Sequence, residues 1–444
     1  MGSTTRISSL FVALYSITLL PGMTAYRSSS FGGLSWSWPS YHIPVLQPSQ
    51  EIALDPPSFH PHSPESPLHV WAPPVQQSEL SDTSNMPTLE ELQEVLSYET
   101  LYSNHTRTLT RVAIQYLEAL PTRFNRSAVR HRTRRRQRRQ VFGIDGRFTV
   151  RGSNYLLRPP FSATARLSSG CSGVLLSPRH VLTAAHCLHD GSDYLPSSKR
   201  LRVGFLRKPR RRDSKRRKGK GRRKEKKRKT RSLMKDTPSP TEPLVLRWTR
   251  VKSMQIPKGW MQGKGLTTEA GLDYDYAVLH LKRKQRQPSL DFGIAPMNMD
   301  NDAVAMGGSG RTSGRLHFSA FDDDRSGNMV YRFCPLERAS SELLYQRCDA
   351  RSGASGAGVY LRLIEWADAP TPATGSSRGA SPRLRLQPQW RRKVVGIFTG
   401  QHWFDNAEEG NEYKSDFNVA VRITPLKYAQ ICFWVKGNIT KCQS

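Results

Sequence analysis

From residue 140 to the C-terminus, short apolar runs alternate with turns rich in glycine, proline and aspartate, and this pattern predicts β-strands. The last element is expected to be a helix, with Thr424 as its N-cap and Pro425 at its first position. These 305 residues suit a single all-β domain. The expected strands are Cys171–Leu176, Leu201–Phe205, Val245–Ile256, Ala277–Leu281, Arg315–Phe321, Met329–Cys334, Gly356–Leu363, Val394–Thr399 and Phe417–Ile423.

The first 25 residues have the pattern of a signal peptide. Arg6 precedes a short apolar run, Leu10–Leu20, and small residues follow at Pro21–Ala25. The run is too short to span a membrane, and no later stretch approaches the required length of about 18 apolar residues. We therefore expect a secreted, extracellular protein without a membrane span. Three sequons then become expected glycosylation sites, at Asn104, Asn125 and Asn438.

Residues 26–139 have a different composition, rich in proline and serine and without cysteine. Such a segment is expected to bury no large core, which predicts a poorly ordered pro-segment. One amphipathic helix is expected within it, over Leu89–Leu96. Thr88 precedes this helix and Glu91 follows three residues later, which is the spacing of a capping box.

The pro-segment ends in a basic run that contains seven arginines between Arg130 and Arg139. Its last four residues, Arg136–Arg139, fit the Arg-x-Arg-Arg preference of the secretory-pathway proprotein convertases. The run lies where the composition changes, so we expect a convertase to cleave between Arg139 and Gln140. The alternative interpretation is a solvated basic linker.

Two short segments carry side chains suited to nucleophilic catalysis. A buried strand expected over Gly173–Val181 runs into the segment Leu182–Cys187, where a tight turn presents His186. Gly353–Gly358 encloses Ser355 between glycines. A serine hydroxyl is a weak nucleophile until a neighbouring imidazole takes its proton. Glycine allows the tight turn that aims two backbone N–H groups at one oxygen.

An acidic residue that orients the histidine is expected between these two segments. Asp275 precedes the apolar run Ala277–Leu281 and fits this role, and Asp273 is a rival by composition. In this order, the three motifs resemble those of the trypsin-like, chymotrypsin-fold (S1) serine peptidases. Stretches at 272–277, 344–349 and 417–432 narrow the resemblance to one pair of related vertebrate proteins within that family.

The resemblance implies two antiparallel six-stranded β-barrels with a C-terminal helix, and a catalytic site at their junction. It implies an endopeptidase for protein substrates, with Ser355 as nucleophile, His186 as general base and Asp275 as its orienting acid. Backbone N–H groups of Gly353 and Ser355 are expected to form the oxyanion hole. No cofactor is expected. The alternative is a catalytically weak or silent protein of the same fold that binds matrix glycosaminoglycans.

The sequence departs from the family pattern beside the nucleophile, where Ala354 replaces the usual aspartate. In trypsin-like zymogens that aspartate pairs with the new N-terminal amine, so activation by this ion pair is not expected. Asp349 lies six residues before Ser355, the offset of the acid at the base of a trypsin-type pocket, and would favour Lys or Arg substrates. The alternative places Asp349 in solvent. Gly400 ends the expected substrate-edge strand, Gly396–Gly400.

All six cysteines lie within the expected protease domain, and an exported chain is expected to oxidise them. Several pairings are possible in principle, and pairing of nearest neighbours makes three small loops. Each such loop contributes about 3 kcal/mol on the chain-entropy model. A metal site is the weaker interpretation because the chain has no CxxC motif. The expected bridges are Cys171–Cys187, Cys334–Cys348 and Cys432–Cys442.

The formal net charge is +32, and Arg207–Arg231 supplies half of it, with eighteen basic and two acidic residues. We expect an insert at residues 206–243 to form a solvated loop that binds polyanions. Outside the cell this predicts heparan sulfate or another glycosaminoglycan as a partner. A nuclear-import signal is a less favoured interpretation of this basic run. Nucleic-acid binding is less favoured still, because no base-reading motif accompanies the run. A second, polar insert is expected at residues 366–390.

Overall fold

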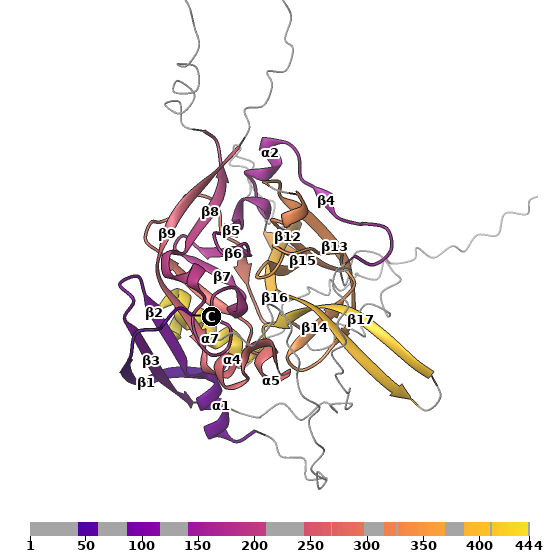
Figure 1. Ribbon diagram of the computed structural model, residues 1–444. Helices are drawn as coiled ribbons and strands as arrows, with labels where there is room; N and C mark the ends of the chain where they lie inside the picture. The colour runs from indigo at the N-terminus through magenta and orange to yellow at the C-terminus, as the bar shows by residue number, and fades with distance from the viewer. Residues whose placement is uncertain are drawn as a thin grey trace, which may run out of the picture. The chain divides into compact units, whose positions relative to one another are not determined.

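Two β-sheets form the framework of the computed structural model (Figure 1). The residues that the structure describes are 43–60, 87–115, 141–209, 244–267, 269–296, 315–325, 327–368, 386–408 and 411–442. No helix in these parts of the chain is long and apolar enough to cross a membrane. The expected signal peptide, Asn125, Arg139 and Gln140 lie outside the described residues.

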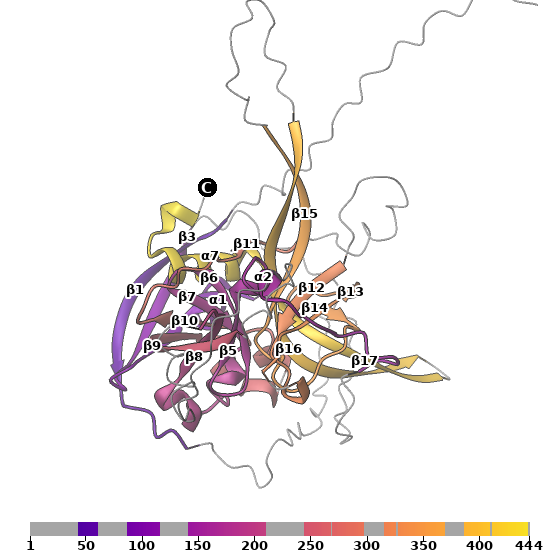
Figure 2. The ribbon, with the colours of Figure 1, turned by 90° about the horizontal axis from the view of Figure 1, so that it is seen from above.

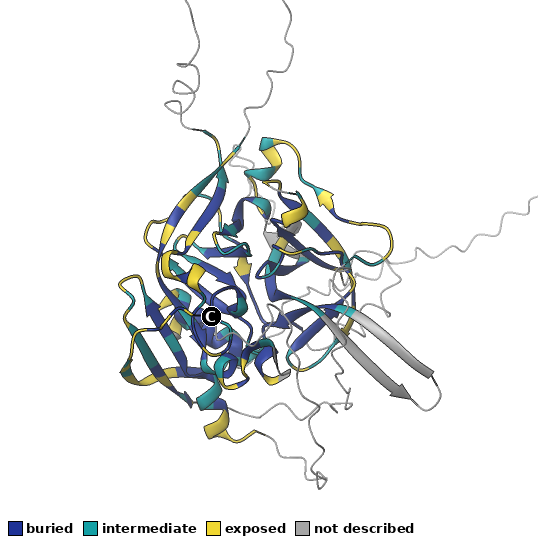
Figure 3. Ribbon diagram, viewed as in Figure 1, coloured by how far each residue is buried: buried dark blue, intermediate teal, exposed yellow. Residues whose placement is uncertain are grey.

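The first sheet closes into a six-stranded antiparallel barrel, because its strand β8 pairs with both β5 and β9. The apolar side chains of these strands fill the barrel interior, where Leu175, Val181 and Leu279 have no exposed surface. Figure 3 shows the buried residues concentrated on these strands. The strands are β5 (Thr164–Leu167), β6 (Ser172–Ser177), β7 (His180–Thr183), β8 (Arg202–Arg207), β9 (Val245–Pro257) and β10 (Ala277–Leu281).

The second sheet closes in the same way, through pairing of β16 with β17. The expected architecture of two six-stranded barrels is therefore confirmed, although β5 and β14 were not predicted. The single buried strand expected over Gly173–Val181 is wrong, because a tight turn divides this stretch into the antiparallel strands β6 and β7. The barrel strands are β12 (Arg315–Ala320), β13 (Val330–Ala339), β14 (Leu343–Gln346), β15 (Gly358–Asp368), β16 (Leu386–Glu408) and β17 (Asn411–Arg422), with β4 (Phe148–Thr149) and β11 (Asp291–Phe292) at the margins.

Helices are short except at the C-terminus, where α7 (Pro425–Lys436) forms as expected. The Thr424 hydroxyl accepts a hydrogen bond from the Lys427 N–H, and Pro425 occupies the first turn. The other helices in the described parts of residues 141–442 are α2 (Ser153–Leu156), α4 (Lys258–Gln262) and α5 (Glu269–Leu272), with 3₁₀ turns η1 (Phe161–Ala163), η2 (Ala185–Cys187), η3 (Pro196–Arg200), η4 (Gly265–Thr267), η5 (Asp323–Arg325) and η6 (Ile439–Cys442).

The expected pro-segment is more ordered than its composition indicated. Its helix α1 (Leu89–Leu96) is confirmed together with the capping box of Thr88 and Glu91. The expectation of poor order is wrong for residues 43–60 and 87–115, because three strands there extend the first sheet from the edge of β9. These strands are β1 (Val45–Leu54), β2 (Tyr98–Tyr102) and β3 (Arg107–Gln115).

Both inserts lie between paired strands. Arg207 at the end of β8 is the ladder partner of Val245 at the start of β9, so the basic insert connects two strands of one hairpin. The expected start of this insert at residue 206 is wrong, because Leu206 and Arg207 belong to β8. The expected bounds of the polar insert need correction, since Asp368 pairs with Leu386 and residues 366–368 and 386–390 extend β15 and β16. Figure 2 shows these two strands running side by side. The interiors of both inserts lie outside the described residues.

The three disulfides are those expected from nearest-neighbour pairing. The bridge Cys171–Cys187 has an S–S length of 2.05 Å and joins the start of β6 to the turn after β7. Cys334–Cys348 lies in the second barrel, and Cys432–Cys442 ties α7 to the C-terminal 3₁₀ turn.

Candidate active site

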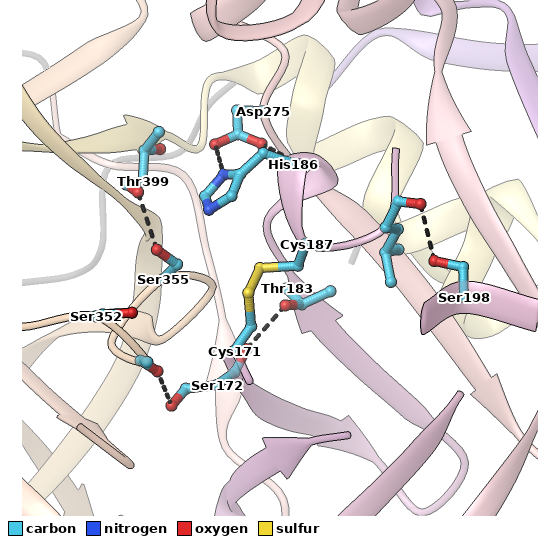
Figure 4. Close-up of a disulfide and its surroundings, with 12 residues drawn as sticks. Cys171, Ser172, Thr183, His186, Cys187, Ser198, Asp275, Ser352, Ser355 and Thr399 are labelled. Carbon is cyan, nitrogen blue, oxygen red and sulfur yellow. Dashed lines mark hydrogen bonds and ion pairs between the residues drawn. A yellow bond between two sulfur atoms is a disulfide. The ribbon is translucent and has the colours of Figure 1, made fainter. Parts of the chain in front are cut away.

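The position of His186 is fixed by the turn that follows β7. Ala184 and Ala185 are fully buried, so the chain turns sharply into η2 and leaves the next side chain at the surface of the barrel. The disulfide between Cys171 and Cys187 holds the turn from its other side (Figure 4). The side chain of His186 keeps 19% of its surface exposed. Its ring is therefore held in place and remains open to a substrate.

Asp275 contacts His186 through both carboxylate oxygens. Oδ1 accepts the backbone N–H of His186 at 2.8 Å, and Oδ2 lies 2.7 Å from the ring Nδ1. The carboxylate has no exposed surface. Because a carboxylate accepts here, Nδ1 carries the proton and Nε2 is left as the basic nitrogen. The sequence left open whether Asp275 or Asp273 contacts the histidine, and the structure shows both contacts made by Asp275.

The protonation of His186 depends on this contact. Burial disfavours the charged imidazolium, but the charge of Asp275 and its hydrogen bond favour that form more strongly. The pKa of His186 is therefore raised above its usual value. A raised pKa makes the imidazole a stronger base, which suits proton transfer from a hydroxyl.

The loop that carries Ser355 is packed tightly against the turn of His186. Gly353 has a φ of +92° and Gly356 a φ of +81°, a backbone region that favours glycine. A Cβ at Gly356 would lie only 2.2 Å from the Thr183 Oγ1. Glycine at this position lets the two barrels approach, so His186 and Ser355 face the same junction (Figure 4).

Ser172 joins the two barrels beneath the site, and sequence reasoning missed it. Its N–H donates to the Ser355 carbonyl at 2.8 Å, and its hydroxyl donates to the Gly353 carbonyl at 2.7 Å. The same hydroxyl accepts the N–H of Phe321 at 2.9 Å. A serine beside Cys171 carries no sequence signal for this role, because the contacts depend on the docking of the second barrel.

The Ser355 hydroxyl donates to the carbonyl of Thr399 at 3.3 Å (Figure 4). Within the described chain it makes no hydrogen bond to His186. Rotation about the Cα–Cβ bond of Ser355 would break this contact and point the hydroxyl in another direction. Gly400 follows Thr399, and a Cβ there would meet nothing within 4 Å. The expected substrate-edge strand therefore passes directly beside Ser355.

The backbone around Ser355 provides two N–H groups that lack protein acceptors. Within the residues described, no hydrogen bond is made by the N–H of Gly353 or of Ser355, although the N–H groups of Ala354 and Gly356 are both satisfied. Such a pair is what an oxyanion hole requires. Ala354 is fully buried in the core of the second barrel. Its methyl side chain carries no charge.

A buried ion-pair cluster supports the loop from below. Arg147 donates to Asp322 at 2.8 Å, and Arg332 donates to the other Asp322 oxygen at 2.5 Å. All three side chains are at most 2% exposed. The next residue, Asp323, donates its N–H to the Ser352 carbonyl at 2.8 Å and accepts the Ser352 hydroxyl at 2.9 Å. The cluster therefore fixes the turn that holds the loop of Ser355.

Replacing Arg147 with methionine is expected to lower the free energy of unfolding by about 3–5 kcal/mol, because Asp322 would stay buried without its full set of partners. Urea denaturation followed by tryptophan fluorescence measures this change. Arg166→Met is the matched control, since Arg166 is 24% exposed and lies 4.0 Å from Asp323. Its loss is expected to cost at most about 1 kcal/mol. Equal costs for the two variants would contradict the role of the cluster.

Asp349 has contacts that a pocket base would not have. Its two oxygens accept the backbone N–H groups of Phe142 and Gly146, both at 2.6 Å, and the residue is only 7% exposed. Neither of the two sequence interpretations, substrate pocket or solvent, described this arrangement. Asp349 instead holds the start of the protease domain against the second barrel. The structure therefore gives no support for a basic-substrate pocket built on it.

Two further groups of predicted residues can be placed. Asn104 and Asn438 are exposed, and each side-chain oxygen accepts the hydroxyl of the threonine of its own sequon at 2.8 Å. Cys171, His186 and Cys187 lie within metal-binding distance of one another. The two sulfur atoms form a disulfide, so they provide no thiolate ligand.

The fold and the site define a chymotrypsin-like serine protease scaffold, and residues 146–237 match the family model described as Trypsin. The chain is 40% identical over 412 residues to serine protease 23 of Homo sapiens, covering 92% of each chain. It is also 40% identical over 447 residues to inactive serine protease 35 of Mus musculus, covering 97% of this chain and 98% of that protein. The chain therefore belongs to the trypsin-like serine protease family.

Among solved structures, a Glu endopeptidase in complex with MPD aligns with a TM-score of 0.38 and 15% identity, covering 67% of this chain and 100% of that chain. Because the name of one curated relative includes the word inactive, membership of the family defines the scaffold and leaves the activity to be argued from the site.

Proposed function

We propose that the protein is a secreted serine endopeptidase. Ser355 attacks the carbonyl carbon of a peptide bond, and His186 takes the hydroxyl proton on Nε2 and later gives it to the leaving amine. Asp275 holds the imidazole in the required tautomer and stabilises its charged form. The observation that carries this proposal is the two-point contact of Asp275 with His186, at 2.8 and 2.7 Å.

The oxyanion hole is proposed to consist of the N–H groups of Gly353 and Ser355. They would stabilise the negative charge that develops on the carbonyl oxygen during attack. Removal of one such donor typically costs about 3–4 kcal/mol of transition-state stabilisation. Because Ala354 carries no charge, this site is proposed to form without an ion pair to an N-terminal amine. The supporting observation is the cluster around Asp322, which braces the loop by other contacts.

The direct test is digestion of denatured protein mixtures by the purified, secreted protein. Mass spectrometry of new N-termini is expected to show internal cleavage sites, and their flanking residues define the substrate preference. The same digestion with Ser355→Ala protein is the control. A folded wild-type protein that generates no new N-termini would favour the alternative, a silent protein of the same fold.

Processing at the end of the pro-segment is proposed to accompany secretion. A convertase hydrolyses the bond between Arg139 and Gln140, so N-terminal sequencing of the secreted protease domain is expected to begin at Gln140, or to be blocked if that glutamine cyclises. Arg139→Ala should prevent the cut. Recovery of an uncut chain from cells with active convertases would contradict this step.

A second proposed function is binding of glycosaminoglycans by the basic insert. The observation that favours it is the eighteen basic residues of Arg207–Arg231, carried between two paired strands. A sulfated polymer that binds there releases many counterions, as a phosphate backbone does, so binding should weaken steeply with salt. Deletion of residues 210–231 is expected to lower the salt concentration at which the protein elutes from heparin.

The deletion spares Arg207, which belongs to β8 and donates to Gln285 at 3.0 Å. Deletion of residues 371–384 in the polar insert is the matched control and should leave heparin elution unchanged. Unchanged elution after removal of the basic residues would place the polyanion site elsewhere on the chain.

A further inference from the structure

The N-terminal residues that extend the first sheet form one unit, which we call the docked segment and define as residues 43–60 and 87–115. Its strand β2 pairs with β9 over Tyr98–Tyr102. Two more backbone hydrogen bonds continue this ladder, from Lys258 N–H to the Ser97 carbonyl at 2.6 Å and from Ser103 N–H to the Lys252 carbonyl at 2.8 Å. Without the docked segment this part of β9 would be an unpaired sheet edge.

Side chains of the docked segment are part of the barrel core. Leu96 is 1% and Leu101 2% exposed, and both belong to the same hydrophobic cluster as Ile256 of β9. Tyr98 packs edge-on against Trp434 of α7, with ring centroids 5.1 Å apart. Burial of this kind supplies the main driving force for association.

Polar contacts lie both at the rim of the same surface and within it. The Lys258 ammonium pairs with Glu94, and the amide of Gln430 donates to the Leu96 carbonyl. The Leu96 carbonyl is at the end of α1 and has no hydrogen-bond donor within its own helix. Gln430 of α7 supplies that donor. The contacts therefore reach both β9 and the C-terminal helix.

The docked segment also contacts the loop that follows His186. The N–H of Ser58 donates to Asp193 Oδ2 at 3.0 Å, and the Ser58 hydroxyl donates to the same oxygen. Burial raises the pKa of Asp193, but hydrogen bonds from Ser58 and from the Tyr194 N–H outweigh this effect and lower it. Asp193 is thus held as a carboxylate at this contact.

Each of the six cysteines pairs with another in the protease domain, and the docked segment has none. No disulfide therefore connects the two parts. Hydrolysis of the Arg139–Gln140 bond consumes water and leaves a carboxylate on Arg139 and an amine on Gln140. After that step noncovalent contacts, the ones described above among them, would hold the docked segment in place.

From these contacts we propose that the docked segment stays bound as a permanent, noncovalent subunit of the protease after cleavage at Arg139. The inference goes beyond the proposed function and rests on it only for the cleavage step. The segment completes the edge of β9 and braces the loop after His186, so it is a structural partner of the protease domain and is not a pro-peptide that leaves on activation.

The test replaces Arg136–Arg139 in the full chain with the recognition sequence of a viral protease of strict specificity, so that the cut does not depend on natural processing. Size-exclusion chromatography of the cut, non-reduced protein in native buffer is expected to give one peak that contains both fragments. In concentrated urea the fragments should separate. Separation already in native buffer would overturn the proposal.

Two leucines of α1 provide matched variants, because Leu96 is 1% and Leu89 44% exposed. Leu96→Ala is expected to weaken association about a hundredfold, and Leu89→Ala to leave it unchanged. Equal effects would overturn the assigned interface. The experiment is repeated with Ser355→Ala, where association should persist. Association without peptidase activity would count against the proposed function alone, and activity without association against this inference alone.

Discussion

Ser355→Ala is expected to reduce peptide hydrolysis by about 10⁶-fold. The change removes the nucleophilic oxygen, so His186 has no hydroxyl proton to accept. Folding should be unaffected, because the hydroxyl makes only one hydrogen bond within the described chain, to the Thr399 carbonyl at 3.3 Å. The measurement is kcat/KM on a peptide chosen from the cleavage sites of wild-type protein.

Ser352→Ala is the matched control for this change. Ser352 is an exposed serine in the same loop, and its hydroxyl donates to Asp323 at 2.9 Å. We expect its loss to change kcat/KM by no more than a few-fold, since an exposed hydrogen bond contributes about 1 kcal/mol. Equal rates for wild-type and Ser355→Ala protein would show that a contaminating protease performs the hydrolysis.

Asp275→Asn is expected to lower kcat by about 10⁴-fold, because an amide at this position can donate to Nδ1 and favour the wrong tautomer of His186. The pH profile should also move. The neutral imidazole is the active form, so wild-type kcat/KM rises with pH through the raised pKa of His186, above the ordinary value of about 6.5. Without the Asp275 charge, burial acts unopposed and this limb moves to lower pH.

Asp273→Asn provides the comparison, since Asp273 lies two residues earlier, whereas Asp275 accepts both the backbone and the ring contact of His186. Its pH profile should match that of wild-type protein. A limb that stays in place in Asp275→Asn and moves in Asp273→Asn would contradict the assignment of the acid. This pair of variants therefore decides between the two carboxylates that the sequence left open.

The barrels and the turns that carry His186 and Ser355 were predictable because their signals are local. His186 follows an apolar strand, Ser355 lies between glycines, and the cysteines close short loops, so each pattern is contained in a few neighbouring residues. The cap of α1 by Thr88 and Glu91 is local in the same sense. Once these strands form, burial of their apolar side chains produces the cores of the two barrels.

Contacts between distant parts of the chain could not be predicted in this way. The pairing of β2 with β9 joins residues more than a hundred positions apart, and proline- and serine-rich flanks concealed the strands of the docked segment. Asp349 was placed by its offset from Ser355, but its oxygens bind the N–H groups of Phe142 and Gly146. The number of residues between an aspartate and the nucleophile does not indicate which backbone N–H groups will bind its carboxylate.

The most direct test of the proposed catalytic serine is reaction of the secreted protein with a labelled fluorophosphonate. Attack by an activated serine oxygen forms a phosphorus–oxygen bond and expels fluoride, so the test requires no knowledge of the substrate. We predict a single adduct, located at Ser355 by peptide mass spectrometry and absent from Ser355→Ala and from denatured protein. A folded, cleaved wild-type protein that acquires no adduct at Ser355 would contradict the account.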